Sequence, residues 1–311
     1  MRATRLADNA LAIGGGYAEE HLTVVATGDG LIVVDTLATL PATRAALPLI
    51  RAFSTEPVRV VINTHLDADH VAGNHAFAGA AIVAHTNGAA HLDERLYDDP
   101  ASEQMVRELV EQQRSSAIPS DPVLAARRQT YIDMYAGMLE GFEDFVPAPP
   151  FLFAPAGTRI VLGAATLELQ HFGPAHTDAD LVIFVPAEEL MLTGDVALGT
   201  GVVPAAHPGH GGSLVGLARA LQAIDSHMTE TLRIVPGHGP IGGPALVREQ
   251  RDYVETLLEA VRNAQARGLT LEDARPALEL PAFSRHLLYD FVHPEHVGLA
   301  WREIAAQAAA R

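Results

Sequence analysis

Four side chains that can bind a metal ion lie within six residues of one another, in the segment THLDADH. They are His65, Asp67, Asp69 and His70. A loop that leaves a strand can turn alternate side chains to one side, and a helix start can then bring His70 beside Asp69. A single His-x-Asp pair is more often an ordinary polar loop, but this density of ligand types behind an apolar run favours a metal site. Such a loop is able to contact two metal ions.

Three further residues have the same setting, each at the end of a predicted strand. They are His176 in FGPAHTDAD, Asp195 in LMLTGDV and His238 in RIVPGHGP, where the flanking glycines allow a close backbone approach. Taken singly, each could be a turn residue, and Asp195 could be a helix cap. Taken together, they predict that metal ligands gather at the carboxyl ends of several strands.

The elements that must position these residues follow from periodicity and turn signals. Predicted strands cover 10–14, 21–27, 31–36, 58–64, 158–162, 165–172, 180–186, 189–195 and 232–236. Predicted helices cover about 40–53, 212–225 and 243–267. Residues 94–150 are interpreted as a helical insertion and residues 271–311 as a helical C-terminal extension. Because each half opens with strands and continues with a helix, the pattern favours an α/β sandwich.

Composition excludes several kinds of chemistry. The 21 basic residues are all Arg, and the 311-residue chain has neither Lys nor Cys. A Schiff-base lysine, a phosphate-loop lysine, a thiolate nucleophile, a disulfide and a Cys-based metal site are therefore ruled out. The formal net charge of −17 disfavours nucleic acid and anionic membranes as partners. The N-terminus lacks a signal-peptide core and the apolar runs are strand-length, so a cytoplasmic location is expected.

The order THxxxDH, GPAHT, TGD and PGHGP resembles the metallo-β-lactamase-fold hydrolase superfamily over nearly the whole chain. The resemblance implies one domain over 1–311, a four-layer αββα sandwich with a metal site, often dinuclear, between the edges of its two sheets. It implies two divalent metal ions, zinc above all, and a catalytic role for Asp69. By the same resemblance, the ligands are His65, Asp67 and His176 for the first ion, Asp69, His70 and His238 for the second, and Asp195 as a bridge.

Asp67 departs from the usual motif of that superfamily, HxHxDH, because it replaces the second histidine. Three carboxylates and a hydroxide would then neutralise two divalent ions, which weakens their Lewis acidity and raises the pKa of bound water. A carboxylate also shifts metal preference toward iron or manganese. The diiron flavoproteins of this fold carry Glu at this position. Asp is one methylene shorter, so whether Asp67 reaches the metal stays open.

Other residues are weaker candidates for the site. His207 and His210 lie on a Gly- and Pro-rich loop that should border the cleft, where they would bind substrate. Tyr135 of the insertion is a further substrate-binding candidate. It belongs to a set that could line an apolar pocket or form a core stripe: Tyr131, Met134, Tyr135, Met138, Phe142 and Phe145.

The remaining histidines outside the motifs are expected to be structural or exposed. His85 and His171 lie on or near strands, where a structural role is expected. His293 and His296 are expected at a solvated helix start.

The function predicted from these observations is that of a metal-dependent hydrolase. In it, a metal-bound hydroxide attacks an ester, thioester, lactone or amide (β-lactam) bond of a small organic substrate. A diiron redox protein without a flavodoxin domain and a non-catalytic metal-binding protein are the alternatives. Self-association into a homo-oligomer is left open.

Overall fold

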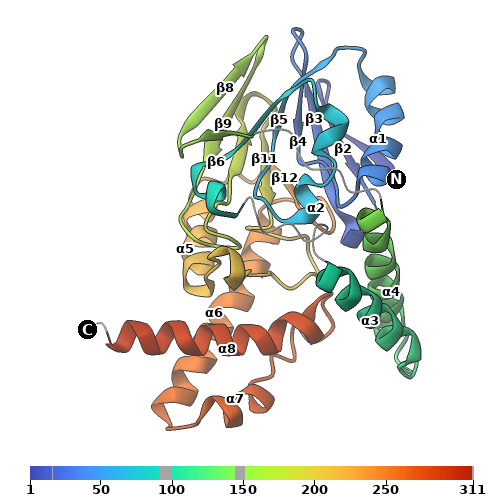
Figure 1. The fold of residues 1–311 in the computed structure, drawn as a ribbon. Coiled ribbons are helices and arrows are strands. Elements are labelled where there is room, and N and C mark those ends of the chain that lie inside the picture. The colour runs from blue at the N-terminus through green and yellow to red at the C-terminus, as the bar shows by residue number, and fades with distance from the viewer. Residues whose placement is uncertain (16, 92–99, 144–150, 310–311) are drawn as a thin grey trace. The chain divides into compact units, whose positions relative to one another are not determined.

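The computed structural model describes residues 1–15, 17–91, 100–143 and 151–309 (Figure 1). The chain divides into two compact units. Unit 1 comprises Met1–Gln170 and Ile183–Met191, and unit 2 comprises His171–Val182 and Leu192–Arg311.

A seven-stranded sheet lies in unit 1, with its strands in chain order across the sheet. The strands are β1 (Arg2–Ala7), β2 (Ala10–Gly14), β3 (His21–Ala26), β4 (Leu31–Val34), β5 (Val58–Ile62), β6 (Ala81–His85) and β7 (Phe151–Ala154). The pairs from β1 to β4 are antiparallel and those from β4 to β7 are parallel. Because parallel strands end at the same edge of a sheet, the residues that follow β4 and β5 lie beside each other.

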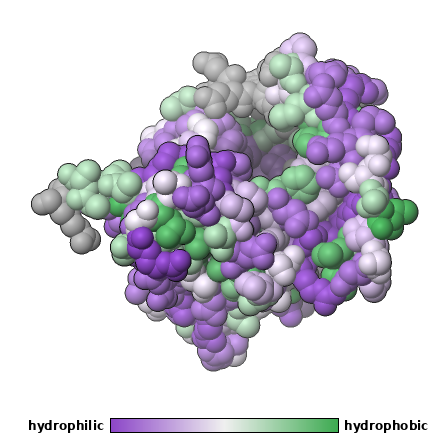
Figure 2. Space-filling model, turned by 90° about the horizontal axis from the view of Figure 1, so that it is seen from below, coloured by the Kyte–Doolittle hydropathy of each residue, from purple (hydrophilic) through white to green (hydrophobic). Residues whose placement is uncertain are grey.

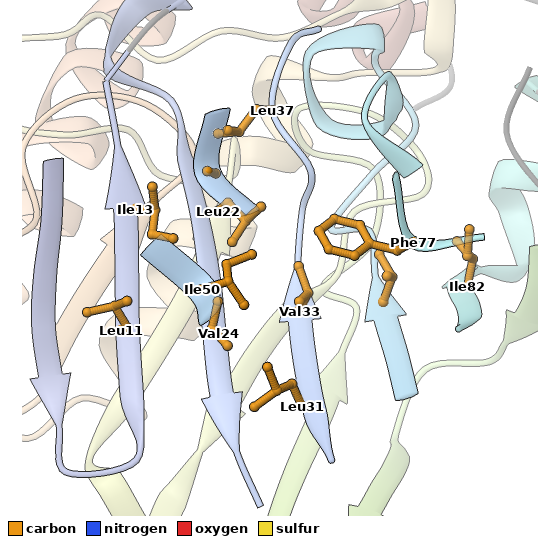
Figure 3. Close-up of a cluster of buried hydrophobic side chains, with 12 residues drawn as sticks. Leu11, Ile13, Leu22, Val24, Leu31, Val33, Leu37, Ile50, Phe77 and Ile82 are labelled. Carbon is orange, nitrogen blue, oxygen red and sulfur yellow. The ribbon is translucent and has the colours of Figure 1, made fainter. Parts of the chain in front are cut away.

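Helix α1 (Leu40–Phe53) covers one face of this sheet. Thr39 caps the helix by accepting a hydrogen bond from the Ala42 N–H, as its position before a Pro-containing first turn favours. Alternate strand residues such as Leu22 and Val24 pack with Ile50 of the helix (Figure 3). Burial of this apolar face stabilises the edge from which the loop with residues 65–70 leaves.

A second, five-stranded sheet has the order β12-β11-β10-β9-β8. Its strands are β8 (Thr158–Leu162), β9 (Ala165–Gln170), β10 (Val182–Val185), β11 (Leu190–Gly194) and β12 (Arg233–Pro236). The β8–β9 hairpin is antiparallel, with Thr158 opposite Leu169. Two of the predicted ligands follow these strands: Asp195 comes directly after β11, and His238 is the second residue after β12.

The helices of unit 2 are α5 (Leu214–Asp225), α6 (Pro244–Ala266), α7 (Leu271–Ala277) and α8 (Tyr289–Ala309). Helix α6 packs on β12 and α5, and α8 packs on α5, α6 and α7 (Figure 1). In unit 1, the remaining α-helices are α2 (Ala68–Val71), α3 (Pro100–Ser115) and α4 (Pro122–Glu143). The last two pack on each other as a hairpin within the segment interpreted as an insertion.

Hydrophilic residues predominate on the face of the molecule shown in Figure 2, with small hydrophobic areas between them. None of the helices in the described part of the chain has the length and hydropathy needed to cross a membrane.

Candidate functional site

The loop after β5 carries the ligand-rich segment of unit 1. Helix α2 begins just after Asp67, yet the Asp67 side chain makes no capping hydrogen bond. Its Oδ2 lies 3.8 Å from Nε2 of His65, which is too long for a hydrogen bond. Two ligands of one metal ion at about 2.1 Å each lie roughly 3.5 Å apart. The spacing of this pair therefore suits a shared ion better than a direct contact.

Asp35, directly after β4, orients two of the histidines. Its carboxylate accepts hydrogen bonds from the Thr64 N–H (2.8 Å), the Thr64 hydroxyl (2.8 Å) and Nδ1 of His70 (2.9 Å). His70 therefore carries its proton on Nδ1 and a lone pair on Nε2. Since the Thr64 hydroxyl proton points to Asp35, its oxygen accepts from Nδ1 of His65 at 3.1 Å. Both histidines thus hold the tautomer that metal-binding histidines adopt.

Asp35 is a candidate site residue that the sequence patterns did not single out. Its signal was the end of LIVVDT, a strand parallel to the one that precedes His65. The residue is buried and has a left-handed backbone, with φ 56°. A non-glycine residue held in this region is strained, which is common where a side chain must be aimed at a site.

Buried polar groups also hold the backbone of His70. Its carbonyl accepts hydrogen bonds from Nδ2 of Asn63 at 2.8 Å and from the Thr36 N–H at 3.0 Å. These contacts explain how a helix of only four residues can keep His70 in place.

Unit 2 brings His176, Asp195 and His238 together, and all three are buried. Oδ2 of Asp195 lies 3.8 Å from Nε2 of His176 and 3.6 Å from Nε2 of His238. Nδ1 of His176 donates to the carbonyl of Ala205 at 2.9 Å, so its Nε2 carries the lone pair. A carboxylate between two imidazoles at these spacings has the geometry of a ligand that shares ions with both.

The loops after β11 and β12 approach each other closely. The Gly199 N–H donates to the carbonyl of His238 at 2.7 Å, and the Gly237 N–H donates to the carbonyl of Gly194 at 2.8 Å. A Cβ at Gly199 would overlap the backbone of Pro240. Glycine is therefore required where the loops that carry Asp195 and His238 meet.

His207 and His210 lie beside His176 within unit 2. The His207 N–H donates to the carbonyl of His176 at 2.7 Å, and a Cβ at Gly212 would overlap that same carbonyl. The ring centroids are 4.0 Å apart for His207 and His210, and 6.4 Å apart for His176 and His207. Two imidazoles on one tetrahedral ion would have centroids roughly 5 Å apart, a spacing that neither of these pairs has. His207 therefore borders the His176 ligand position, and its role in substrate binding stays a prediction.

Among the described residues, the His and Asp side chains that could hold metal ions fall into two sets by unit. They are His65, Asp67, Asp69 and His70 in unit 1, and His176, Asp195, His207, His210 and His238 in unit 2.

The α3–α4 hairpin packs on the helix that carries Asp69 and His70. Met138 of α4 forms a buried cluster with Val106 of α3 and Ala72, next to α2. Tyr135 packs on this cluster, and burial raises the pKa of its hydroxyl. Tyr131 and Met134 are also buried, which favours the core-stripe interpretation for these residues. The side chain expected at 145 lies outside the described residues.

The expectation for His293 and His296 is wrong. They are only 4% and 2% exposed, because α8 is not a solvated extension here but packs on α6. Burial lowers the pKa of His296 to about 3 and also lowers that of His293. His171 donates from Nδ1 to the carbonyl of Asp180 at 2.8 Å, and His85 is buried, in keeping with structural roles.

A family model described as the metallo-beta-lactamase superfamily matches residues 20–238 of this chain. The chain therefore belongs to the metallo-beta-lactamase superfamily. The predicted fold is confirmed: solved metallo-β-lactamases share its two sheets flanked by helices.

Among curated proteins, the chain is similar to a linear primary-alkylsulfatase from Pseudomonas sp. (strain ATCC 19151). The two are 23% identical over 265 residues, which cover 81% of this chain and 48% of the relative. The chain thus spans about half the length of the curated relative it matches.

Two solved structures show the same fold. The metallo-beta-lactamase from Pontibacter korlensis has a TM-score of 0.58 at 18% identity and covers 82% of this chain and 98% of its own. The stereoselective inverting sec-alkylsulfatase Pisa1 from Pseudomonas sp. has a TM-score of 0.70 at 18% identity and covers 97% of this chain and 50% of its own.

Proposed function

We propose that this chain is a metal-dependent hydrolase that holds two divalent ions. The proposed ligands are His65, Asp67, Asp69, His70, His176, Asp195 and His238. The observation that carries the proposal is the state of three buried histidines, His65, His70 and His176. Each carries its proton on Nδ1, which leaves Nε2 to bind an ion.

The divalent ions would supply a low-pKa water at neutral pH and a positive charge for the oxyanion that forms. The chain's own residues hold and orient the reactants. Asp35 keeps the His70 ring turned so that Nε2 faces away from it, because its carboxylate accepts a hydrogen bond from the Nδ1–H of His70. Asp69, half-buried in the first turn of α2, is the carboxylate that we assign to take a proton from the attacking water.

Zinc is the proposed metal because the seven proposed ligands are four imidazoles and three carboxylates, which are ligand types that zinc accepts. Iron and manganese are the alternatives. Asp67 supports them, because a carboxylate oxygen is a harder ligand than the imidazole it replaces.

The proposed substrate is a small organic molecule with an ester, thioester, lactone or amide bond. The half-buried Tyr135, on a helix that packs next to Asp69 and His70, supports a partly apolar substrate. A sulfate ester is a second candidate, favoured by the similarity to the linear primary-alkylsulfatase over most of this chain.

The test uses the full chain, stripped of metal and then reloaded with zinc, manganese or iron(II). Each form is assayed on a carboxylic ester, a lactone, a β-lactam and an alkyl sulfate. We expect activity only in reloaded protein. His70→Ala should abolish it, whereas His75→Ala, which removes an exposed histidine near the same loop, should not. Metal binding without turnover of any substrate would favour the non-catalytic alternative, and iron loading with oxygen chemistry would favour the redox alternative.

A further inference from the structure

We propose that His296 and Tyr253, neither of which is a metal ligand, position His176 through a single peptide group. This inference rests on the proposed function, in which His176 is a metal ligand.

The peptide group between Ala205 and Ala206 connects the two histidines. Its carbonyl oxygen accepts the hydrogen bond from Nδ1 of His176 at 2.9 Å. Its N–H, from Ala206, donates to Nε2 of His296 at 3.2 Å. The peptide group is planar, so a partner that holds the N–H also holds the direction of the carbonyl. His296 therefore sets the orientation of the acceptor that fixes the His176 ring.

The donors and acceptors beyond His296 form a series of hydrogen bonds that all run in the same direction. Because Nε2 of His296 accepts, its Nδ1 carries the proton and donates to the Tyr253 hydroxyl at 3.3 Å. That hydroxyl is then free to donate to Nδ1 of His293 at 2.9 Å. His293 in turn donates from Nε2 to the carbonyl of Leu278 at 2.6 Å. Each proton in this series has one acceptor, so the tautomers of His293 and His296 are determined.

The burial of these groups explains why this hydrogen-bond series can hold the Ala205–Ala206 peptide group firmly. Tyr253 on α6 is 0% exposed, and His293 and His296 on α8 are nearly as buried. Water cannot readily replace a partner at this depth, so loss of one hydroxyl or ring leaves the others unsatisfied. Helix α8 thereby acts on the site from the C-terminal segment of the chain.

Two measurements test the positioning role. The first is the tautomer of His176 in metal-free protein, read from the ring nitrogens by ¹H–¹⁵N NMR. The second is the affinity for each of two zinc ions, from competition with a chelator. In His296→Leu we expect loss of the pure Nδ1–H tautomer of His176. One zinc ion should bind about 10-fold to 100-fold more weakly and the other as in the wild type.

Conservative variants separate positioning from general damage. His296→Gln keeps an acceptor near the Ala206 N–H and should restore most of the affinity. Tyr253→Phe should lower the affinity for the same zinc ion. Tyr289→Phe is the matched control, because that hydroxyl lies in the same cluster but accepts from the Leu280 N–H instead. Circular dichroism verifies that each variant is folded.

The inference is overturned if the His176 tautomer is unchanged in His296→Leu and Tyr253→Phe, or if Tyr289→Phe weakens zinc binding equally. A wild-type protein that binds no divalent ion would instead contradict the proposed function. The NMR measurement would still decide the positioning role, since it needs no metal.

Discussion

Asp67 is the residue at which this chain departs from the usual superfamily motif. Its carboxylate makes no capping hydrogen bond and lies 3.8 Å from Nε2 of His65, a spacing that two ligands of one ion can have. Its role as a ligand of the first ion stays a prediction. Whether a side chain as short as that of Asp67 reaches the ion is the question that substitution can answer.

Substitution of Asp67 tests this role. Asp67→Ala should lose the first ion and keep the second, which other ligands hold. Asp67→His should raise zinc occupancy and lower the apparent pKa of the pH–rate profile, because it removes one negative charge from the cluster. Metal analysis and hydrolysis rates against pH provide the measurement. Equal metal content in wild type and both variants would show that Asp67 is not a ligand.

Asp35 is predicted to affect metal binding although it is not one of the proposed ligands. Asp35→Asn replaces the carboxylate that accepts from His70 and Thr64. We expect the affinity for the second ion to fall about 10-fold to 100-fold, measured by zinc competition. Asp29→Asn removes an exposed carboxylate and should bind zinc as the wild type does. Unchanged affinity in Asp35→Asn would contradict the orienting role.

At the scale of elements, the α3–α4 hairpin and the short helix α2 depend on each other. Helix α2 has only four residues, too few to be stable alone, so packing must hold it. The buried cluster around Met138 provides that packing next to the residues that carry Asp69 and His70.

Substitution of Met138 by Ala measures how much this packing contributes to stability. Met138 is 7% exposed and Met105 on α3 is 51% exposed. Met138→Ala should lower the free energy of unfolding by about 2–3 kcal/mol, because it leaves a cavity, whereas Met105→Ala should change it little. Chemical denaturation of both variants gives the comparison. Equal effects would show that the hairpin does not rest on this cluster.

At the scale of the whole molecule, the buried histidines predict a loss of stability in acid. The pKa of His296 is about 3 in the folded protein and 6.5 in an unfolded chain. The unfolded state therefore takes up a proton first as the pH falls. The contribution of His296 is complete above pH 6.5 and is lost progressively as the pH falls toward 3.

This loss is measured by the free energy of unfolding of metal-free protein between pH 7 and pH 4. The wild type should lose more stability over this range than His296→Gln, by up to a few kcal/mol. His227→Gln, which changes an exposed histidine, should lose as much as the wild type. If the free energy of unfolding changed with pH equally in the wild type and His296→Gln, the burial of a neutral ring at this position would be contradicted.

The sequence alone determined which segments carry the proposed ligands and much of the secondary structure around them. Helix α1 covers Leu40–Phe53 as predicted, and β5 ends just before Thr64 and His65. These features are local: a cap, an apolar periodicity or a polar run after a strand is contained in neighbouring residues. The short strands β1, β6 and β7 were missed. For β6 and β7 the partners are distant in the sequence, whereas β1 pairs with the adjacent strand β2 in a tight hairpin.

Only the tertiary structure decided how the histidines are oriented and which of them are buried. Asp35 meets His70, and Ala206 meets His296, across long stretches of chain that no local pattern connects. The sequence shows that His296 is a histidine in a helical segment, but its burial depends on α8 packing against α6. The type of a ligand is a property of one residue. Its tautomer and direction are properties of partners that folding brings to it.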